Sequence, residues 1–437
     1  MKFCLTIFLI SSGLSLAGIV PVTTSISEAV AIAQEGDTLL LSGPAVYHER
    51  IVLTKSIRLL GTNSPIVDAD ASGTPLTIRA ANTEVRGLVI RNSGRDLAGF
   101  DSGIMITAPR AAVRDCRIEV DAFGVYIRGA NECIIEGNII FGTTNLAPAT
   151  RGNGIHLWKT QRNRITGNVI HDKRDGMYFS YANDNLIADN RIWDTRFGIH
   201  YMYSHQNRLL TNLLTRNAVG ATLMFSRQSV IDGNTVTDNR RHGLLFKQLD
   251  NSQIRNNVVS GQNRGIFIQQ ATQNRFEGNL IATNDIGLYL SNCSEQNVFV
   301  GNDFIRNSEQ VWQPPFETAQ GRQSPNFFAE NGRGNYWSDY TGNDRNHDGI
   351  GDTPYHQTDV FGYIVDRHPA ARVFALSPAV VLLRKGEELL PLLNVPGVTD
   401  QAPSMSPGCR PIGGQRLALL NPNKETVLLG SANKSFR

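Results

Sequence analysis

Short runs in which apolar residues alternate with other residues recur along the middle of the chain, over residues 135–304. In Gly198-Ile199-His200-Tyr201, for example, Ile199 and Tyr201 flank the polar His200. A spacing of two is the period of a β-strand, and no apolar stripe with helical spacing accompanies it. Each run follows a polar segment of the form Asn-x-apolar-x-x-Asn-x-apolar. The pattern predicts many short strands separated by polar turns.

The polar segments repeat with a nearly constant period. Successive copies of the second asparagine are 22 or 23 residues apart, except for one step of 30, and stand at Asn138, Asn168, Asn190, Asn212, Asn234, Asn257, Asn279 and Asn302. A glycine column keeps the same spacing at Gly124, Gly154, Gly176, Gly198, Gly220, Gly243, Gly265 and Gly287. A fixed period in the twenties indicates a solenoid in which each repeat forms one coil.

The two-residue period of the apolar positions indicates which class of solenoid the repeat forms. Leucine-rich repeats have a similar length, but they need a dense leucine frame and a helical return that this sequence lacks. We therefore predict an all-β fold, a right-handed parallel β-helix with rungs of 22 or 23 residues. Residues one period apart then stack about 4.8 Å from each other, and stacked asparagine amides can bond along their column.

The segments around the repeat divide the chain into five expected parts. Residues 1–17 have the positive start, short apolar core and small-x-small end of a secretory signal peptide, so we expect export to the periplasm. Residues 18–45 are expected to form an N-terminal cap with a helix, and residues 46–305 the β-helix. Residues 306–375 follow as a C-terminal cap with an Asp-rich loop. Residues 376–437 are expected to form a helical docking segment and a flexible tail.

Composition argues against a nucleic-acid partner and against a cysteine-based framework or metal site. The chain has 42 Lys and Arg against 39 Asp and Glu, and only 8% of its residues are aromatic. Neither value favours a nucleic-acid partner, and we expect none. The five cysteines form no CxxC pair, so neither a disulfide framework nor a thiolate metal site is indicated.

A candidate calcium site lies in the Asp-rich loop. The loop has the form D-x-N-x-D-G-x-x-D, which matches the first nine positions of an EF-hand loop. Its ligands are side-chain oxygens and one backbone carbonyl, from Asp344, Asn346, Asp348, Ile350 and Asp352. The acidic residue expected at position 12 is missing, since Tyr355 stands there. The alternative is an Asn/Asp-rich turn that closes the solenoid without metal.

A candidate copper site lies on the outer face of the rungs. If Ile199 and Tyr201 point inward, His200 and Met202 point outward, and Met224 follows Met202 by one period. His156 precedes His200 by two periods. Thioether and imidazole groups are the ligands that Cu(I) prefers, so we predict copper binding by His156, His200, Met202 and Met224. The alternative is a ladder of large side chains that pack on one another.

Polysaccharide lyases and epimerases are the rival class of function, because they also use β-helices. Proton abstraction beside a carboxylate needs acids or cations on one face. The outward column contains no stacked acids and reads Met105, Tyr126, His156, Tyr178, His200, Thr222, Leu245, Phe267, Tyr289. We therefore expect a protein that is not an enzyme, with a carbohydrate-active enzyme as the alternative.

Several motifs outside the repeat indicate which family of β-helix proteins the chain resembles. They are Gly36-Asp37-Thr38-Leu39, Tyr47-His48-Glu49, Leu60-Gly61, the segment from Gly334 to Tyr340, the Asp-rich loop and Thr353-Pro354-Tyr355. With the Asn/Gly rungs, they resemble the NosD family over nearly the whole mature chain. The resemblance implies a periplasmic accessory protein of denitrification that helps to mature the copper centres of nitrous oxide reductase. The implied partners are that reductase, the ATPase and permease of an ABC transporter, and a copper-chaperone lipoprotein.

The resemblance also suggests a use for the leucine-rich C-terminal segment. Two apolar stretches there contain Leu382, Leu383, Leu389, Leu390, Leu392 and Leu393. Exposed apolar stretches interrupted by charges suit docking on the periplasmic surface of a membrane partner. The alternative is a helix folded back over the last coil.

Overall fold

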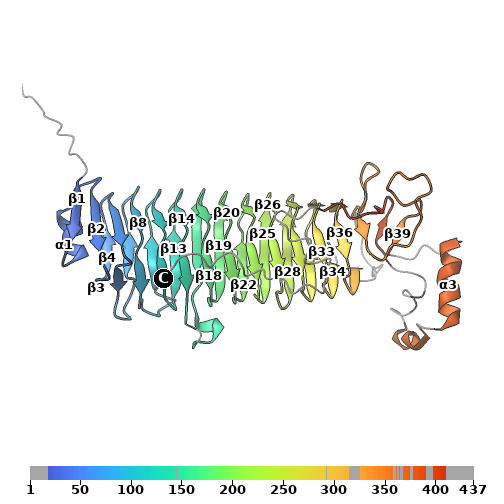
Figure 1. The fold of residues 1–437 in the computed structure, drawn as a ribbon, viewed down its shortest axis with the longest axis horizontal. Coiled ribbons are helices and arrows are strands. Elements are labelled where there is room, and N and C mark those ends of the chain that lie inside the picture. Colours follow the sequence, from blue (N-terminus) through green and yellow to red (C-terminus); the bar gives the residue numbers. More distant parts are fainter. Residues whose placement is uncertain are drawn as a thin grey trace, which may run out of the picture.

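The computed structural model describes residues 18–143, 145–291, 293–313, 325–357, 361, 364, 368–374, 377–389 and 397–409. These residues form an elongated stack of short parallel strands, with helix α1 at one end and helix α3 at the other (Figure 1). The architecture confirms the predicted all-β parallel β-helix. The expected signal peptide lies outside the described residues.

Three parallel sheets of 13, 13 and 12 strands run the length of the described stack. Sheet A contains β1 (Ile19–Val22), β2 (Thr38–Ser42), β5 (Arg58–Thr62), β8 (Glu84–Arg86), β11 (Ala112–Arg114), β14 (Ile134–Glu136), β17 (Arg164–Thr166), β20 (Leu186–Ala188), β23 (Arg208–Leu210), β26 (Val230–Asp232), β29 (Gln253–Arg255), β32 (Arg275–Glu277) and β35 (Val298–Val300). Sheet B contains β3 (Val46–His48), β6 (Ile66–Asp68), β9 (Val89–Arg91), β12 (Arg117–Glu119), β15 (Ile139–Phe141), β18 (Val169–His171), β21 (Arg191–Trp193), β24 (Leu213–Thr215), β27 (Thr235–Thr237), β30 (Val258–Ser260), β33 (Leu280–Ala282), β36 (Asp303–Ile305) and β38 (Tyr336–Trp337).

Sheet C has the longest strands. It contains β4 (Ile51–Leu53), β7 (Leu76–Ile78), β10 (Ser102–Ile106), β13 (Phe123–Arg128), β16 (Ile155–Gln161), β19 (Asp175–Asn183), β22 (Phe197–Met202), β25 (Val219–Arg227), β28 (His242–Asp250), β31 (Arg264–Gln269), β34 (Ile286–Leu290) and β37 (Glu309–Trp312). Outside these sheets lie the antiparallel pair β39 (Tyr355–His356) and β40 (Thr399–Asp400), two 3-10 helices η1 (Pro148–Thr150) and η2 (Pro369–Phe374), and the helices α1 (Ile26–Ile32) and α3 (Pro378–Leu389). None of the helices in the described part of the chain has the length and apolar content needed to cross a membrane.

Alternation along each strand builds the core. Ile199 and Tyr201 of β22 are fully buried, whereas Met202 is only partly covered. Stacked over the rungs, the inward residues form one continuous apolar core. The glycine column is required by close contact between rungs, because a Cβ on Gly198 would lie 2.4 Å from the carbonyl oxygen of Gly220. The same crowding recurs along the column and excludes any larger residue there.

The asparagine column forms the predicted hydrogen-bonded ladder. Asn190 Nδ2 donates to the side-chain oxygen of Asn212 at 2.9 Å and to the carbonyl oxygens of Ile165 and Ala188. Its own Oδ1 accepts from the backbone and side-chain amides of Asn168. These asparagines do not have left-handed backbone themselves. The residue before each of them does, as at Asp189, where φ is 57°. The buried amides therefore satisfy the backbone at the turn between sheets A and B.

Both ends of the solenoid differ from the expected boundaries. At the start, β1 and β2 already belong to sheet A, within the segment expected as a cap. Helix α1 covers the open end and buries Ile26, Ala29 and Val30 against the core. Its first turn is capped by Glu49, which accepts from the amides of Ile26 and Ser27 at 2.6 and 3.0 Å.

At the other end, the rungs continue past residue 305 into β37 and β38. Asn335 extends the asparagine ladder by one rung, since its Oδ1 accepts from the backbone amide of Asn302 at 3.0 Å. Asp400, from the returning C-terminal segment, takes the next place and accepts from the amide of Asn335 at 2.7 Å. A carboxylate has no N–H to donate onward, so the ladder ends there.

Candidate functional site

The two methionines of the expected copper site are direct neighbours on the outer face of sheet C. Met202 of β22 and Met224 of β25 are aligned partners in adjacent strands. Both are half-buried, and both stand beside inward residues that are fully buried, Tyr201 and Leu223. The next residue in their column is Lys247. The methionine pair therefore occupies two rungs and is bounded on one side by a cation.

His200 lies on the same face, two residues before Met202. Its Nδ1 is 3.2 Å from a carboxylate oxygen of Asp175, and its Nε2 is buried without a hydrogen-bond partner among the described residues. Asp175 also accepts two hydrogen bonds from Arg196, at 2.8 and 2.7 Å. Burial alone raises the pKa of Asp175, but the hydrogen bonds from His200 and Arg196 outweigh it, and the net shift is downward.

An ionised Asp175 determines which nitrogen of His200 carries the proton. A carboxylate anion only accepts hydrogen bonds, so Nδ1 of His200 donates to it. In the neutral ring, Nε2 then carries the free lone pair, which is the arrangement that a metal-binding histidine with a carboxylate partner uses. Thr222 is the aligned partner of His200 in the next strand, and its hydroxyl is also buried and unpartnered among the described residues.

His156 is separated from this group. It aligns with Tyr178, which in turn aligns with His200, so the two histidines lie two rungs apart with a tyrosine ring between them. The rings of His156 and Tyr178 have centroids 4.9 Å apart, and Phe123 and Tyr126 also contact His156. Burial lowers the pKa of His156 to about 4. His156 is therefore a neutral member of an aromatic stack near pH 7.

The Asp-rich loop uses its side chains to hold its own backbone. Asp344 accepts from the amides of Asp348 and Gly349 at 3.2 and 2.9 Å, and Asp348 accepts from the amide of Ile350 at 2.8 Å. Asn346 donates to Asp348, and Asp352 accepts from the amide of Arg345. Asp344 is partly buried, and the side chains of Asn346, Asp348 and Asp352 are exposed. Calcium binding here stays a prediction, which calorimetric titration of the metal-stripped protein tests.

A histidine–aspartate cluster near the N-terminal end was not predicted from the sequence. Within the described ranges, it is the one group of three His, Cys, Asp or Glu residues whose ligand atoms lie within 4.8 Å of one another, and it consists of His48, Asp68 and Asp70. Asp68, however, already accepts from Arg91 Nε at 2.7 Å and from Asn92 at 2.8 Å. The Arg91 guanidinium neutralises the Asp68 carboxylate, whose negative charge a metal cation would need. The feature that could have revealed this cluster from the sequence is that His48 and Asp68 occupy aligned positions in adjacent strands.

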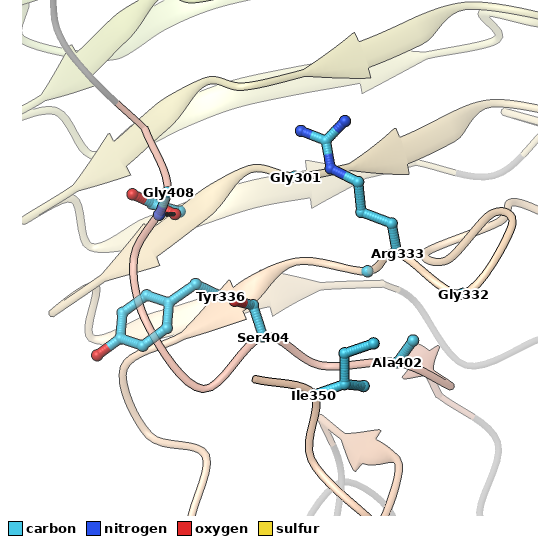
Figure 2. Close-up of a pocket in the computed structure, with 10 residues that line it drawn as sticks. Gly301, Gly332, Arg333, Tyr336, Ile350, Ala402, Ser404 and Gly408 are labelled. Atoms are coloured by element: carbon cyan, nitrogen blue, oxygen red, sulfur yellow. Dashed lines mark hydrogen bonds between the residues drawn. The ribbon is translucent and has the colours of Figure 1, made fainter. Parts of the chain in front are cut away.

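A cavity at the C-terminal end of the solenoid lies where two segments of the chain pack against each other. It lies between the last rungs and the returning segment, where Tyr336 and Ser404 are bridged side by side (Figure 2). Its charged groups are engaged, because Asp303 accepts from the amides of Gly408 and Cys409 and Arg333 pairs with Glu277. The cavity joins two segments of the chain and presents no free charged group to a ligand.

Helix α3 exposes part of the expected docking segment. Val380 is buried, but Leu382 and Leu383 are 70% and 39% exposed. Ser377 begins the helix, as its hydroxyl accepts from the amide of Val380. The side chains of Leu389, Leu390, Leu392 and Leu393 lie outside the described residues. The described helix thus carries an outward apolar face of at least two leucines.

Comparisons with known proteins agree with the motifs. Residues 142–342 match the family described as "Periplasmic copper-binding protein (NosD)". A protein of Stutzerimonas stutzeri named "Probable ABC transporter binding protein NosD" is 31% identical over 376 residues, which cover 82% of this chain and 85% of that protein. A protein of the same name from Pseudomonas aeruginosa is 38% identical over 112 residues, which cover 26% of this chain and 24% of that protein.

Solved structures resemble the chain at low identity. The A-module of the mannuronan C-5 epimerase AlgE4 of Azotobacter vinelandii is 17% identical, with a TM-score of 0.48 over 69% of this chain and 88% of that chain. The Dettilon tailspike protein is 14% identical, with a TM-score of 0.49 over 64% of this chain and 62% of that chain. At these values the likeness carries no inference about activity.

Proposed function

The chain belongs to the NosD family, and from this we propose that it is a non-enzymatic periplasmic scaffold that handles copper for the maturation of nitrous oxide reductase. The family description supports the periplasm and copper, and the names of the relatives support a binding protein that works with an ABC transporter. The permease and ATPase of that transporter, a copper-chaperone lipoprotein and the reductase are the proposed partners.

The observation that carries the copper role is the group formed by Met202, Met224 and His200. Two thioethers stand on neighbouring rungs, whose strands are about 4.8 Å apart, and the His200 imidazole lies on the same face. Thioether and imidazole ligands select Cu(I) over the harder divalent cations. We propose that Cu(I) is the cargo held there, and that Lys247 confines it to these two rungs.

Exchanging both methionines tests the copper site. We expect the Met202→Ile/Met224→Ile variant to lose Cu(I) affinity by at least about 10-fold, which is ~1.4 kcal/mol, in anaerobic competition with a chromophoric chelator. Met105→Ile is the matched control, because Met105 also faces outward from sheet C but its aligned neighbours are Thr77 and Tyr126. Equal Cu(I) affinity in the double variant and the control would discard the site.

Export to the periplasm is part of the same proposal. The charge and apolar pattern of residues 1–17 support cleavage after Ala17. Mass spectrometry of the protein recovered from the periplasm is expected to show Gly18 as its first residue. A chain that retains residues 1–17, or that stays in the cytoplasm, would contradict this part.

A further inference from the structure

An arginine and a histidine on neighbouring rungs of sheet C have buried polar atoms without partners. Arg264 of β31 and His242 of β28 are aligned in adjacent strands. Among the described residues, neither Arg264 Nε nor His242 Nδ1 has a hydrogen-bond partner, although both atoms are buried. Unpaired polar atoms in a protein interior are rare and cost folding free energy. Two of them on aligned residues therefore indicate that a partner outside the chain completes their hydrogen bonding.

Aromatic rings cover the flat faces of both side chains and leave their edges available. Arg264 Cζ lies 4.3 Å from the ring centroid of Tyr289 and 5.4 Å from that of Phe267. The His242 ring stacks on Phe267, with centroids 5.2 Å apart and planes at 17°. Stacking satisfies none of the ring or guanidinium nitrogens, because their hydrogen bonds lie in the plane of each group. The planar fork of a guanidinium binds oxyanions through two parallel hydrogen bonds.

Two arginines without acidic partners surround these atoms. Arg241 directly precedes His242. Arg196, two rungs before Arg241 in the same column, pairs with Asp175 at 2.7 Å, whereas neither Arg241 nor Arg264 forms an ion pair in the described part of the chain. Their positive charge reaches the histidine, because burial, Arg264 and Arg241, in that order, lower the pKa of His242 to about 4. The site therefore repels metal cations and attracts anions.

The neighbouring rungs limit the size of the site. In the column of the arginine–histidine pair, the buried Val219 precedes the pair and the half-buried Ile286 follows it. Asp285, next to Ile286, accepts from the side chain of Asn263 at 2.9 Å and supplies no ion pair to either arginine among the described residues. The polar edges thus span only two rungs, whose strands are about 4.8 Å apart. One small ion can contact both.

We propose that His242, Arg264 and Arg241 form a binding site for a small tetrahedral oxyanion with two negative charges, of the sulfate or hydrogen phosphate type. Two guanidinium groups match the charge of a dianion. A sulfate oxygen only accepts hydrogen bonds, so Arg264 Nε donates to it, and the neutral His242 ring donates from Nδ1. The site lies outside the methionine pair and does not depend on the copper role.

Nuclear magnetic resonance of His242 during a sulfate titration tests the site. The probe is sodium sulfate, and sodium chloride at the same ionic strength is the reference, because both then screen surface charges equally. A dianion beside the ring favours its protonated form. We expect sulfate to bind the form with a protonated His242 at least about 10-fold more tightly than the neutral form, which is seen as a higher pKa of His242. Loss of the signal in His242→Phe identifies it. An equal pKa in sulfate and chloride overturns the proposal.

Arginine variants test the donors. Arg264→Gln is expected to weaken sulfate binding at least about 10-fold in calorimetry and to abolish the response of the His242 pKa to sulfate. Arg241→Gln changes an exposed side chain that the fold does not need, and it is expected to weaken sulfate binding as well. The matched control is Arg208→Gln, because Arg208 is also an exposed arginine without an ion pair among the described residues, with the apolar neighbours Leu186 and Val230. Sulfate affinity in Arg264→Gln or Arg241→Gln equal to that of the control overturns the proposal.

Two further anions establish the class of ligand. Acetate carries one charge and is expected to bind at least about 10-fold more weakly than sulfate. Inorganic phosphate is tested in mildly alkaline buffer, where it is mainly dianionic, and the tighter of the two dianions identifies the ligand. Acetate binding as tight as that of sulfate contradicts a dianion site. The absence of Arg264-dependent binding of both sulfate and phosphate overturns the site altogether.

Discussion

At the scale of single residues, stability rests on buried amides that are fully paired. Asn190 is fully buried and makes hydrogen bonds to four neighbouring residues through its side chain. Alanine at this position leaves backbone and side-chain groups without partners in the interior. A buried unpaired polar group costs about 1–3 kcal/mol, so the asparagine ladder is a sensitive point of the fold.

We predict that Asn190→Ala lowers the free energy of unfolding by about 3 kcal/mol. Asn263→Ala is the control, since Asn263 is exposed and its side chain donates only to Asp285; its expected effect is within about 0.5 kcal/mol. Urea unfolding followed by circular dichroism measures both. Similar midpoints for the two variants would show that the ladder contributes little.

The carboxylate behind His200 gives a second prediction at this scale. Asp175→Asn replaces a carboxylate, which only accepts hydrogen bonds, with an amide that also donates, so the proton is no longer fixed on Nδ1 of His200. We expect Cu(I) affinity to fall by about 10-fold or more, as for other second-layer partners of metal ligands. Asp175 acts through His200 and is a positioning residue. In a His200→Ala background, the same change is expected to have no further effect on Cu(I) affinity. An equal loss in both backgrounds would mean that Asp175 only supports the fold.

A third prediction concerns acid stability. Burial, together with Arg264 and Arg241, lowers the pKa of His242 from 6.5 to about 4. Between these values the unfolded chain binds a proton that the folded chain does not, so the free energy of unfolding falls as the pH falls, by at most about 1.4 kcal/mol per pH unit for this group. Above pH 6.5 the contribution is complete.

His242→Phe provides the comparison, because phenylalanine keeps the stack with Phe267, whose ring centroid is 5.2 Å away. Unfolding midpoints measured from pH 7 to pH 4 are expected to fall less steeply in the variant than in wild type. Parallel slopes would mean that His242 titrates normally in the folded protein.

At the scale of elements, the returning C-terminal segment closes the solenoid. Asp400 of β40 is fully buried and accepts hydrogen bonds from the amide and side chain of Asn335, from Trp337 Nε1 and from the amide of Ala402. Asp303 holds the amides of Gly408 and Cys409 in the same way. β39 pairs with β40, and its Tyr355 stacks on Trp337 of the last rung, so the segment that carries α3 is anchored to the solenoid on both sides.

We predict that Asp400→Ala releases this segment. Removing the acceptor leaves several buried donors unpaired, each at about 1–3 kcal/mol, so residues 399–409 are expected to lose protection from hydrogen exchange while the rungs around Asn190 keep theirs. Asp352→Ala, on the exposed Asp-rich loop, is the control. Unchanged exchange of residues 399–409 would contradict the role of Asp400.

At the scale of the whole molecule, the solenoid separates two surfaces. The methionine pair lies on β22 and β25 in the middle of sheet C, and α3 lies beyond the last rung (Figure 1). Truncation after Ser377 is a poor test of α3, because it also removes Asp400 and Cys409, which are buried against the last rungs. Substitutions on the exposed face of α3 leave that closure in place.

We predict that Leu382→Glu/Leu383→Glu abolishes co-purification with the transporter permease while Cu(I) affinity stays at the wild-type value. Both leucines are exposed on α3, so the charges do not disturb the core. Val373→Glu, at a residue of η2 that is 85% exposed, is the control for an exposed apolar residue outside the helix. Retained co-purification of the leucine variant would exclude this face as the docking site.

The regular part of the site was predictable because the period is nearly constant. The stacking of Met202 on Met224, and the column that contains His156, Tyr178 and His200, have the register that the repeat predicts. Copper binding itself stays a prediction. The bond from His200 to Asp175 was not predicted, since the two residues are 25 positions apart and lie in different columns. A repeat shows which residues align but not which rotamers they adopt.

The amino-acid sequence alone determines the rungs, the alternation of inward and outward side chains, and the residue types on each face. It does so because every rung pairs with its neighbours at the same, nearly constant period. Contacts across long separations in the chain follow no such period. The folded structure was needed to show Asp400 at the end of the asparagine ladder, Glu49 at the cap of α1, and the bond from His200 to Asp175. These features depend on how chain segments meet in three dimensions, where hydrogen bonds and steric limits select one arrangement among many that the pattern permits.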